Sequence, residues 1–216
     1  MKIFLDTANL QAIKEHAGIY SGITTNPAIM AKDGAEQKER LIEICKIVPD
    51  LPISGEVIYS LSTSQVIQDA LTIAAIAPNI VVKIPGDAVG MGAISFLKKK
   101  GIKLNVTALM TGKQLIIAAL LGADYVSQFY CRGKDAGLDS IREIAVARSF
   151  IEEQELDTQI IVGSLRSVDD VEQVLLSGAH IATITPELIK ASFSHFKTDE
   201  SILEFANKYE QSINKK

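Results

Sequence analysis

The chain alternates short runs rich in Ile, Val and Thr with longer segments of helical periodicity, and this alternation constrains its fold more than any other feature. Strands that alternate with helices predict a parallel sheet, because each helix carries the chain back to the start of the next strand. The eight runs are Lys2–Asp6, Gly22–Asn26, Ile53–Val57, Ile80–Ile84, Lys103–Thr107, Tyr125–Phe129, Ile160–Ser164 and Ile181–Thr185. Between them, the segment 66–74 shows the i, i+3/i+4 apolar spacing of a helix with one buried side.

Residues typical of helix ends lie between these runs. Thr111 with Gln114, and Ser167 with Asp170, have the spacing of N-terminal capping boxes. Thr185–Pro186 fits a capping residue followed by proline in the first helical turn. Glycines follow three helical segments as C-terminal caps would, at Gly101, Gly122 and Gly178. These signals support the alternation of strands and helices.

Eight strand–helix units in 216 residues lie near the lower size limit of a (β/α)8 TIM barrel. A doubly wound open sheet is the alternative, and it usually carries a glycine-rich phosphate loop after its first strand. Here Thr7–Asn9 follow the first strand without a glycine, which favours the barrel. Since the chain has no linker-like or low-complexity segment, we expect one domain over residues 1–216, with a C-terminal helix at about 201–213.

Charge and composition exclude several classes of partner. The 22 Lys and Arg against 26 Asp and Glu give a net charge of -4, which provides no general attraction to nucleic acid or to an anionic membrane. No segment approaches the ~20 apolar residues of a spanning helix. Asp6 interrupts the first apolar run, so no secretory signal is predicted. Cys45 and Cys131 are too few for a disulfide framework or a zinc cluster. We therefore expect a cytoplasmic protein without a metal or other cofactor.

Polar residues interrupt strands that would otherwise be apolar on both faces. In a parallel barrel the C-terminal ends of the strands form the mouth, where active sites are built. Side chains two apart on one strand share a face, so Asn105 and Thr107, for example, are expected to point together into the mouth. The polar residues at such positions are Asp6, Thr24, Asn26, Glu56, Lys83, Asn105, Thr107, Ser127, Ser164 and, just beyond its strand, Arg166.

Lys83 is the only charged residue in its strand. Burial among apolar side chains disfavours an ammonium ion, and a neutral amine is a nucleophile for a carbonyl carbon. Two structural alternatives remain open for this lysine: it reaches solvent at the strand end, or it pairs with Glu56. Asp6 and Glu56 come from different strands. Two acids in one mouth can act separately, one as general acid or base and one as a positioner of water, or one of them can neutralise the lysine.

A segment suited to anion binding follows the seventh strand. Ser164, Arg166 and Ser167 precede a capped helix, and barrels often bind phosphate in the loops after strands seven and eight. Arg166 offers a bidentate cation, and the two serines offer hydroxyl groups. The alternative is that Ser167 only caps the helix and Arg166 is a solvated charge. Arg132, shortly after the sixth strand, is a second candidate for an anion contact.

With these residues assembled, the chain from Met1 to about Tyr209 resembles the small transaldolase and fructose-6-phosphate aldolase family. Each matching phrase alone is weak, but together, in order and at the right spacings, they are specific. The phrases are FLDTAN at 4–9, GITTNPAIM at 22–30, GEV at 55–57, IVVKIP at 80–85, GIKLNVTAL at 101–109, GADYVSQF at 122–129 and VGSLR at 162–166.

The resemblance implies a metal-free class I aldolase mechanism, in which Lys83 forms a Schiff base with a sugar phosphate. Asp6 matches the family's general acid/base, and Asn26 matches the residue that holds substrate and lysine in place. The remaining implied roles are positioning of the catalytic water by Glu56 and Thr107, contacts to dihydroxyacetone hydroxyls by Asn105 and Ser127, and phosphate binding by Ser164, Arg166 and Arg132.

Two positions favour the transaldolase branch. In the family, transaldolases resemble this chain in having Glu at position 56 and Phe at 129, whereas aldolases have Gln and Tyr there. A tyrosine hydroxyl can order the water that frees dihydroxyacetone; the ring of Phe129 cannot, so the three-carbon unit waits for an aldehyde acceptor. The segments 86–91 (GDAVGM) and 128–132 (QFYCR) depart from the family pattern beside the mouth. These departures leave the acceptor open, as well as the choice between a phosphate and a sulfonate terminus.

The resemblance therefore implies transfer of a dihydroxyacetone unit between sugar phosphates, with sedoheptulose 7-phosphate or fructose 6-phosphate as donor. The alternatives are an aldolase that releases dihydroxyacetone, and a non-catalytic barrel that binds a phosphorylated sugar. The resemblance also implies a homo-oligomeric ring, a decamer being one form. Residues 201–213 have the periodicity of a helical arm that would join such a ring, or of a helix that packs on its own barrel.

Overall fold

Eight parallel strands close into a barrel in sequence order, with β8 paired to β1. The structure is a computed structural model that describes residues 1–58 and 60–213. The strands are β1 (Lys2–Asp6), β2 (Ile23–Thr24), β3 (Ile53–Glu56), β4 (Ile80–Pro85), β5 (Leu104–Leu109), β6 (Tyr125–Phe129), β7 (Gln159–Gly163) and β8 (Ile181–Ile184). The predicted (β/α)8 TIM barrel is confirmed, and the open sheet is excluded because the strands close on themselves.

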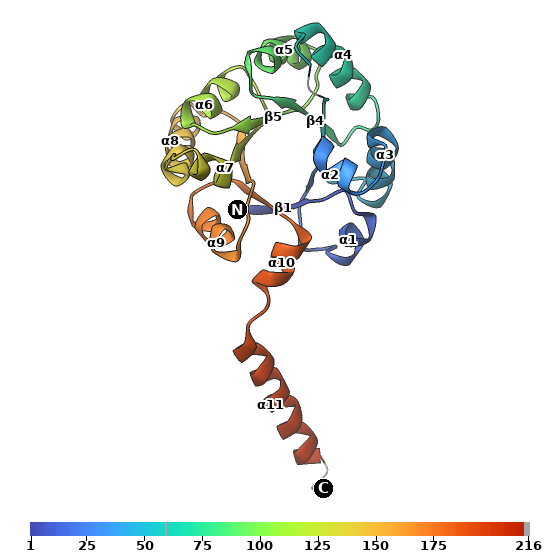
Figure 1. The fold of residues 1–216 in the computed structure, drawn as a ribbon, viewed down its shortest axis with the longest axis vertical. Helices are drawn as coiled ribbons and strands as arrows, with labels where there is room; N and C mark the ends of the chain where they lie inside the picture. The colour runs from blue at the N-terminus through green and yellow to red at the C-terminus, as the bar shows by residue number, and fades with distance from the viewer. Residues whose placement is uncertain (59, 214–216) are drawn as a thin grey trace.

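Helices lie between the strands and surround the barrel (Figure 1). They are α1 (Leu10–Glu15), α2 (Pro27–Lys32), α3 (Gln37–Ile47), α4 (Thr63–Ala74), α5 (Ala88–Lys99), α6 (Gly112–Leu120), α7 (Tyr130–Asp135), α8 (Ser140–Glu153), α9 (Val168–Leu176), α10 (Pro186–Ser192) and α11 (Phe196–Ile213). Figure 1 shows the short helices α2 and α7 on opposite sides of the barrel opening, inside the ring of outer helices.

The predicted helix ends are confirmed. Thr111 and Ser167 each form a complete capping box, and Thr185 caps α10 ahead of a proline in its first turn. The three predicted capping glycines all have positive φ angles, at Gly101, Gly122 and Gly178. A left-handed backbone at these positions costs glycine little, because it has no Cβ atom. Local sequence therefore sets where these helices begin and end.

Strand β2 differs most from its predicted bounds: it ends at Thr24 and not at Asn26. Asn26 instead caps α2: its side-chain oxygen accepts a hydrogen bond from Ile29 N at 2.8 Å, and Pro27 occupies the first helical turn. Strand β7 ends at Gly163, because Ser164 adopts a φ of 60°. Both strands therefore end before these polar residues, and Asn26 and Ser164 lie just beyond the strand ends at the mouth.

The barrel is closed at its other end by apolar side chains. A small cluster within the strands joins Phe4, Ile161 and Ile181, with Tyr125 packed against it. The Phe4 ring occupies the space beside Gly22, where a Cβ atom would lie 2.5 Å from the ring. Glycine at position 22 therefore leaves room for the Phe4 ring in this apolar cluster. The larger apolar core lies between the outer faces of the strands and the helices.

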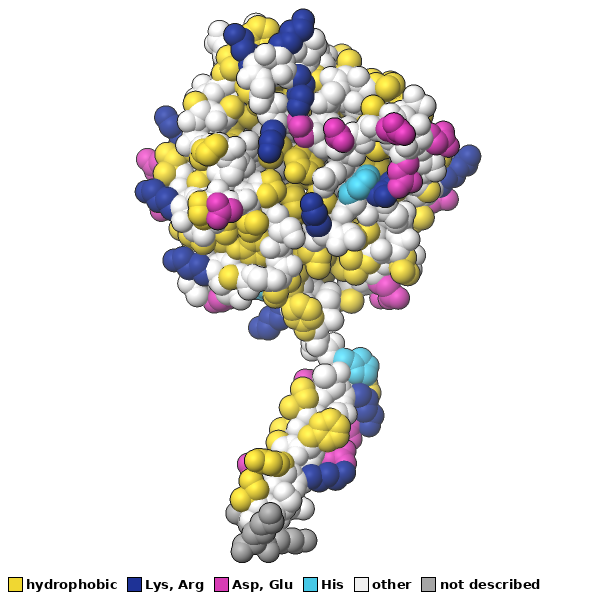
Figure 2. Space-filling model, turned by 180° about the vertical axis from the view of Figure 1, so that it is seen from behind, with side chains coloured by type: hydrophobic (Ala, Val, Ile, Leu, Met, Phe, Trp, Pro, Cys, Tyr) yellow, Lys and Arg dark blue, Asp and Glu magenta, His cyan; other side chains and the backbone are white. Residues whose placement is uncertain are grey.

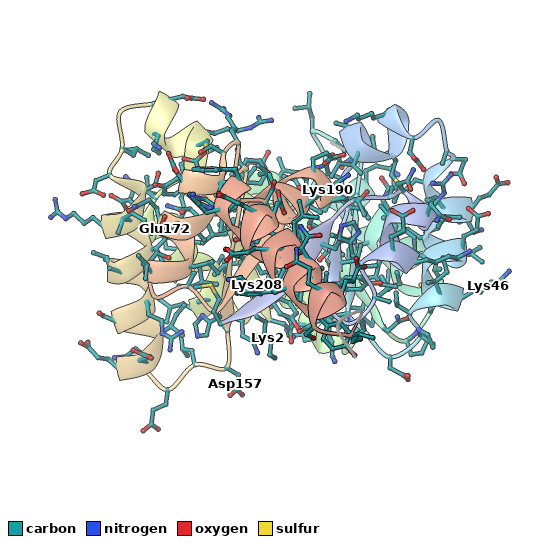
Figure 3. All side chains as sticks on the ribbon, turned by 90° about the horizontal axis from the view of Figure 1, so that it is seen from below. Lys2, Lys46, Asp157, Glu172, Lys190 and Lys208 are labelled. Atoms are coloured by element: carbon teal, nitrogen blue, oxygen red, sulfur yellow. The ribbon has the colours of Figure 1, made fainter. Side chains whose placement is uncertain are left out.

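Helix α11 extends away from the barrel as an arm (Figure 1), and it begins at Phe196, earlier than the predicted start near residue 201. None of its residues is buried, so it does not pack on its own barrel. Figure 2 shows apolar side chains along one edge of the arm and charged side chains along the other. Viewed from its far end, the arm lies in front of the barrel, with Lys208 on it (Figure 3). Its exposed apolar residues are Phe196, Ile202, Leu203, Phe205, Tyr209 and Ile213.

Within residues 1–58 and 60–213, none of the helices combines the length and the apolar character needed to cross a membrane.

Candidate active site

A cavity of about 300 Å³ lies at the C-terminal ends of the strands. Nine of the twelve residues predicted for the site line it; Glu56, Asn105 and Arg166 do not. The lining residues are Asp6, Thr24, Asn26, Ala28, Ile29, Lys32, Lys83, Thr107, Ser127, Phe129, Arg132, Gly163, Ser164 and Thr183. The barrel thus brings together side chains from positions 6 to 183 of the chain, as parallel strands with a shared mouth require.

Lys83 lies on β4 and is buried, with 4% of its surface exposed. Its Nζ lies 3.0 Å from Glu56 Oε2 and donates a hydrogen bond to the carbonyl oxygen of Thr25 at 3.1 Å. The pairing of β3 with β4 sets Glu56 beside Lys83 directly. The lysine therefore does not reach out to solvent. The ion pair with Glu56 is present, and it holds the nitrogen at the wall of the cavity.

Asp6 ends β1 on the same cavity. Thr24 Oγ1 donates a hydrogen bond to Asp6 Oδ1 at 2.6 Å, and Thr183 Oγ1 lies 2.5 Å from Thr24 Oγ1, so three side chains form one chain of hydrogen bonds. The pKa of Asp6 is raised because desolvation outweighs the opposing effects of the Lys83 charge and the Thr24 hydrogen bond. A carboxyl group with a raised pKa exchanges protons closer to neutral pH, as a general acid or base must.

Below the rim, three buried polar side chains form a connected network. Ser127 Oγ donates to Asn105 Oδ1 at 2.7 Å, and Asn105 Nδ2 donates to Ser54 Oγ at 3.1 Å. Ser127 lines the cavity, whereas Asn105 is fully buried behind it. The network fixes the orientation of the Asn105 amide, because its oxygen and its nitrogen each have a defined partner.

Thr107 lies two residues beyond Asn105 on β5 and lines the cavity. Its Oγ1 is buried, and no hydrogen-bond partner for it exists within residues 1–58 and 60–213. A buried hydroxyl without a partner is costly, and such groups cluster where a ligand or a reacting water completes the hydrogen bond. Thr107 therefore supplies a free hydroxyl to the cavity.

Two aromatic and cationic side chains shape the rim on the α7 side. Phe129 ends β6 and caps α7, and the guanidinium carbon of Arg132 lies 5.3 Å from the centre of the Phe129 ring. Both residues line the cavity. Stacking on the ring holds Arg132 over the mouth as a cation.

The loop after β7 is fixed by Asp170. Its carboxylate accepts hydrogen bonds from the backbone N–H groups of Arg166 and Ser167, and also from Cys131 Sγ at 3.3 Å and Lys134 Nζ at 3.1 Å. Burial raises the pKa of Asp170, but these hydrogen bonds outweigh it and lower the pKa to about 2. Asp170 thus stays ionised and ties the loop that carries Ser164 to helix α7.

Arg166 lies outside the cavity lining. Its guanidinium forms two hydrogen bonds to Asp135, at 2.5 and 3.0 Å, and the side chains of both residues are more than half exposed. Exposed ion pairs contribute little to stability, so breaking this one to bind an anion costs little. A role for Arg166 in phosphate binding stays a prediction.

Sequence reasoning missed four groups at the site: Thr25, Lys32, Ser54 and Thr183. Ser54 lies two residues before Glu56 on one strand, so period-two alternation would have found it. Thr183 interrupts an apolar strand in the same way as Thr24. Thr25 acts through its backbone carbonyl, which carries no sequence signal, and the position of Lys32 depends on how the short helix α2 is oriented.

Within the described part of the chain, no group of three or more His, Cys, Asp or Glu side chains is arranged to hold a metal ion.

Known proteins similar to this chain share one description. The model of the family described as Transaldolase/Fructose-6-phosphate aldolase matches residues 3–216. A probable transaldolase from Alkaliphilus metalliredigens (strain QYMF) is 39% identical over 97% of this chain and 98% of the relative. A probable transaldolase from Clostridium botulinum (strain Hall) is 40% identical, over 99% and 98%. Probable transaldolase 1 from Bacillus cereus is 40% identical over the full length of both chains.

Proposed function

The chain belongs to the transaldolase/fructose-6-phosphate aldolase family, and we propose that it transfers a dihydroxyacetone unit from a ketose phosphate to an aldose phosphate through a Schiff base on Lys83. The observation that carries the proposal is the buried amine of Lys83 on a cavity that also holds the carboxyl group of Asp6. An amine held by two hydrogen-bonding partners is oriented before substrate arrives.

The first half of the cycle forms and breaks bonds at the donor. Glu56 lies close enough to take the proton that the ammonium group of Lys83 must lose. The neutral amine attacks C2 of the ketose and passes one of its protons to the oxygen. Glu56 then returns the proton that it took, the oxygen leaves as water, and an iminium ion forms. Asp6 then accepts the proton of the C4 hydroxyl, the C3–C4 bond breaks, and its electron pair moves into the iminium ion. An aldose phosphate departs, and an enamine of dihydroxyacetone stays on the lysine.

The second half reverses these steps with another aldehyde. The enamine carbon attacks the aldehyde carbon, and Asp6 returns its proton to the oxygen, which becomes the new C4 hydroxyl. Water then adds to the iminium carbon, and the new ketose phosphate leaves the amine. We assign the positioning of this water to Glu56 and Thr107, because Glu56 pairs with the lysine and Thr107 lines the same cavity with a hydroxyl that has no partner among the described residues. Asn26 and Ser127, which line the cavity, are proposed to bind the dihydroxyacetone hydroxyls near Lys83, and Asn105 to support them by orienting Ser127 from behind.

Transfer is favoured over release because the cavity carries Phe129 where a hydroxyl would be needed to order a second water. Release of free dihydroxyacetone, as in a fructose-6-phosphate aldolase, is the alternative. A transaldolase for a sugar with a sulfonate terminus is a second alternative, since Arg132 and Ser164 suit either anion.

One assay separates these reactions. With fructose 6-phosphate and an aldose phosphate acceptor, we expect a new ketose phosphate to form and little free dihydroxyacetone to appear. Without the acceptor, turnover should stop after one equivalent of enamine has formed. Continuous release of dihydroxyacetone without acceptor would show the aldolase, and turnover of only the sulfonated sugar would show the second alternative.

Replacing Thr107 with Val tests the free hydroxyl. Valine has a similar shape and lacks the unpartnered hydroxyl, so we expect the thermal midpoint to stay equal or rise. Turnover should fall about tenfold to a hundredfold, equivalent to roughly 1.4 to 2.8 kcal/mol of transition-state stabilisation. Kinetics and thermal unfolding measured on the same preparations check both. Thr107→Ser is the control and should keep most of the turnover; a Thr107→Val variant that unfolds earlier would instead indicate a structural hydroxyl.

We also propose that residues 1–216 form one domain, whose arm α11 joins subunits into a homo-oligomer. The apolar edge of α11 supports this, because a water-exposed amphipathic helix is normally covered by a partner. The expected ring, with a decamer as one form, and the cytoplasmic location remain predictions.

A charge on the apolar edge of the arm should weaken the oligomer. We expect Phe205→Asp to lower the molar mass measured by light scattering towards that of the monomer, because burying an unpaired carboxylate at an apolar interface is costly. Gln211 lies two and a half helical turns beyond Ile202, on the opposite edge, so Gln211→Asp is the matched control and should leave the mass unchanged. Equal masses for both variants would place the interface elsewhere.

A further inference from the structure

Lys32 is an exposed cation at the edge of the active-site cavity that the mechanism above does not use. It is the last residue of α2, which begins at Pro27 directly after the capping residue Asn26. It lines the active-site cavity, and it also lines a second cavity of about 480 Å³ beside it. The two cavities share Asp6, Ile29 and Lys32, so Lys32 stands where one opens into the other.

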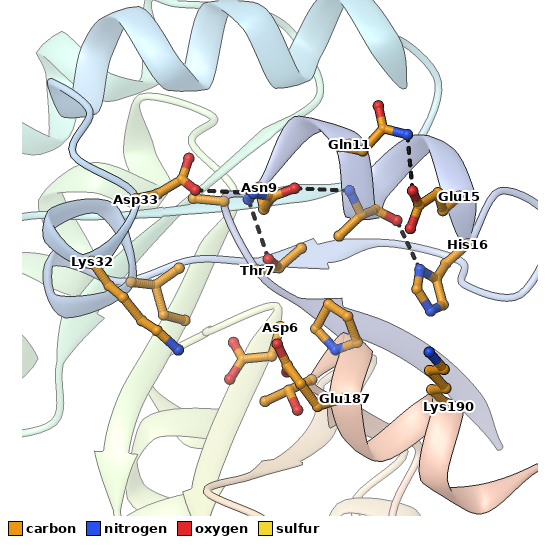
Figure 4. A pocket seen from close by; sticks show the side chains of 15 residues that line it. Asp6, Thr7, Asn9, Gln11, Glu15, His16, Lys32, Asp33, Glu187 and Lys190 are labelled. Atoms are coloured by element: carbon orange, nitrogen blue, oxygen red, sulfur yellow. Dashed lines mark hydrogen bonds between the residues drawn. The ribbon is translucent and has the colours of Figure 1, made fainter. Parts of the chain in front are cut away.

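The second cavity runs outward from the mouth between α1, α2 and α10 (Figure 4). In Figure 4 the side chain of Lys32 extends from α2 towards the side on which Asp6 lies, and Lys190 lies farther out on α10. The carboxyl groups along this cavity are Asp6, Glu15, Asp33 and Glu187. A dianionic substrate that enters here meets these acids and needs a cation to offset them.

Lys32 has no ion-pair partner within residues 1–58 and 60–213. The neighbouring acid, Asp33, instead binds the guanidinium of Arg40 and accepts a hydrogen bond from Asn9 at 3.2 Å. The pKa of Glu187, which lines the second cavity, is lowered mainly by backbone and Thr185 hydrogen bonds to its carboxylate. The positive charge of Lys32 lowers this pKa further, so it acts across the second cavity. An unpaired cation on the rim of a cavity is free to bind an anion.

The closed barrel places this lysine opposite Arg132. Helix α2 follows β2 and α7 follows β6, and these strands lie half a turn apart in a barrel of eight. Figure 1 shows both helices at the opening, on opposite sides. Arg132 and Lys32 therefore reach the same cavity from its two sides, while the guanidinium of Arg166 is held by Asp135.

We propose that Lys32 binds the terminal anion of the sugar's aldose part and is a specificity-determining residue for phosphorylated substrates. The inference rests on the proposed transfer reaction, in which the leaving and the incoming aldose occupy the same place in turn. The two differ in chain length, so their terminal anions lie at different depths. Lysine is a compact charge on a flexible four-carbon stem, so this one side chain can follow the anion between the two depths.

With sedoheptulose 7-phosphate as the donor, the test compares two acceptors that differ only in the anion, glyceraldehyde 3-phosphate and glyceraldehyde. In a two-step transfer, kcat/KM for the acceptor reports only on the second step, so an effect on the donor does not interfere. We expect Lys32→Met to lower kcat/KM for glyceraldehyde 3-phosphate about tenfold to a hundredfold, the usual range for one charge-assisted hydrogen bond. The value for glyceraldehyde should stay within about twofold, because no anion is present in that reaction.

Lys190→Met is the matched control, because Lys190 lines the second cavity but not the active-site cavity. It should change neither value, and Lys32→Arg should keep most of the preference for the phosphorylated acceptor. An equal loss for both acceptors, no loss for either, or a selective loss with Lys190→Met would each overturn the inference. A borohydride-reducible adduct in Lys32→Met confirms that the first step is intact; its absence from the unaltered enzyme would contradict the proposed function instead.

Discussion

Replacing Lys83 with Met is expected to remove both transfer activity and the covalent adduct that borohydride traps from fructose 6-phosphate. The amine of Lys83 is the proposed nucleophile, and methionine fills a similar volume without a nitrogen. Loss of a covalent nucleophile typically costs far more than loss of a binding group, so we expect turnover to fall by at least about a thousandfold. Mass spectrometry of the reduced protein, with digestion to locate the modified peptide, checks the adduct.

Lys46→Met is the matched control for this experiment. Lys46 is an exposed residue on α3, at the outer surface of the barrel (Figure 3), and its replacement should change neither turnover nor adduct. Removing the amine leaves Glu56 without its ion-pair partner, so thermal unfolding of Lys83→Met should be measured first. An adduct that survives in folded Lys83→Met would refute the assignment.

Replacing Asp6 with Asn is expected to stop C3–C4 bond cleavage while the amine still reacts. Asparagine can accept the hydrogen bond from Thr24, so the geometry of the mouth is kept, but it cannot take a proton from the C4 hydroxyl. General acid–base catalysis typically contributes about 10²- to 10⁴-fold, and we expect a loss of turnover of that order. The adduct with dihydroxyacetone, which needs no bond cleavage, should still be trapped by borohydride. Loss of the adduct as well would place Asp6 in the formation of the Schiff base.

The raised pKa of Asp6 also predicts how stability changes with pH. The folded state favours the protonated form of this carboxyl group, so ionisation at neutral pH works against folding. The protonated carboxyl group of Asp6 stabilises the folded state fully below the ordinary pKa of an aspartate. This stabilisation is lost as pH rises through the raised pKa of the folded state. We therefore expect Asp6→Asn to raise the urea midpoint at pH 7, and the gain to shrink as pH falls towards about 4. A variant less stable than the unaltered protein at pH 7 would contradict this account.

The catalytic pH profile should follow the same group. Because Asp6 must be ionised to accept the proton, the acid limb of kcat should lie above the ordinary range of an aspartate.

Much of the barrel was predictable because its determinants are local. The spacing of apolar residues separated strands from helices. Capping side chains such as Thr111 and Ser167 form hydrogen bonds with residues only three positions away. Lys83 and Asp6 stood out for a similar reason. A charged residue in an otherwise apolar strand is rare without a function, and that contrast is visible in the sequence. The predicted end of β2 was wrong at Asn26, because this residue caps the following helix and does not continue the hydrogen-bonded strand.

The partners of these residues could not be predicted in the same way. That Glu56 meets Lys83 depends on the register of β3 with β4, and that Thr183 meets Thr24 depends on closure of β8 onto β1. The ion pair of Arg166 with Asp135 joins the loop after β7 to the end of α7, and the sequence does not state the distance between them. Lys32 enters the cavity only because α2 is folded over the barrel opening.

The sequence by itself thus determined the barrel, its polar mouth and the lysine and acid on which the proposed chemistry depends. Periodicity, capping and burial act over a few residues and can be read along a chain. Only the tertiary structure decided which side chains share a hydrogen bond, which cations remain free to bind an anion, and that α11 leaves the barrel with its apolar edge uncovered. Those outcomes depend on strand register and on loop positions, which join residues far apart in the chain, such as Thr24 and Thr183.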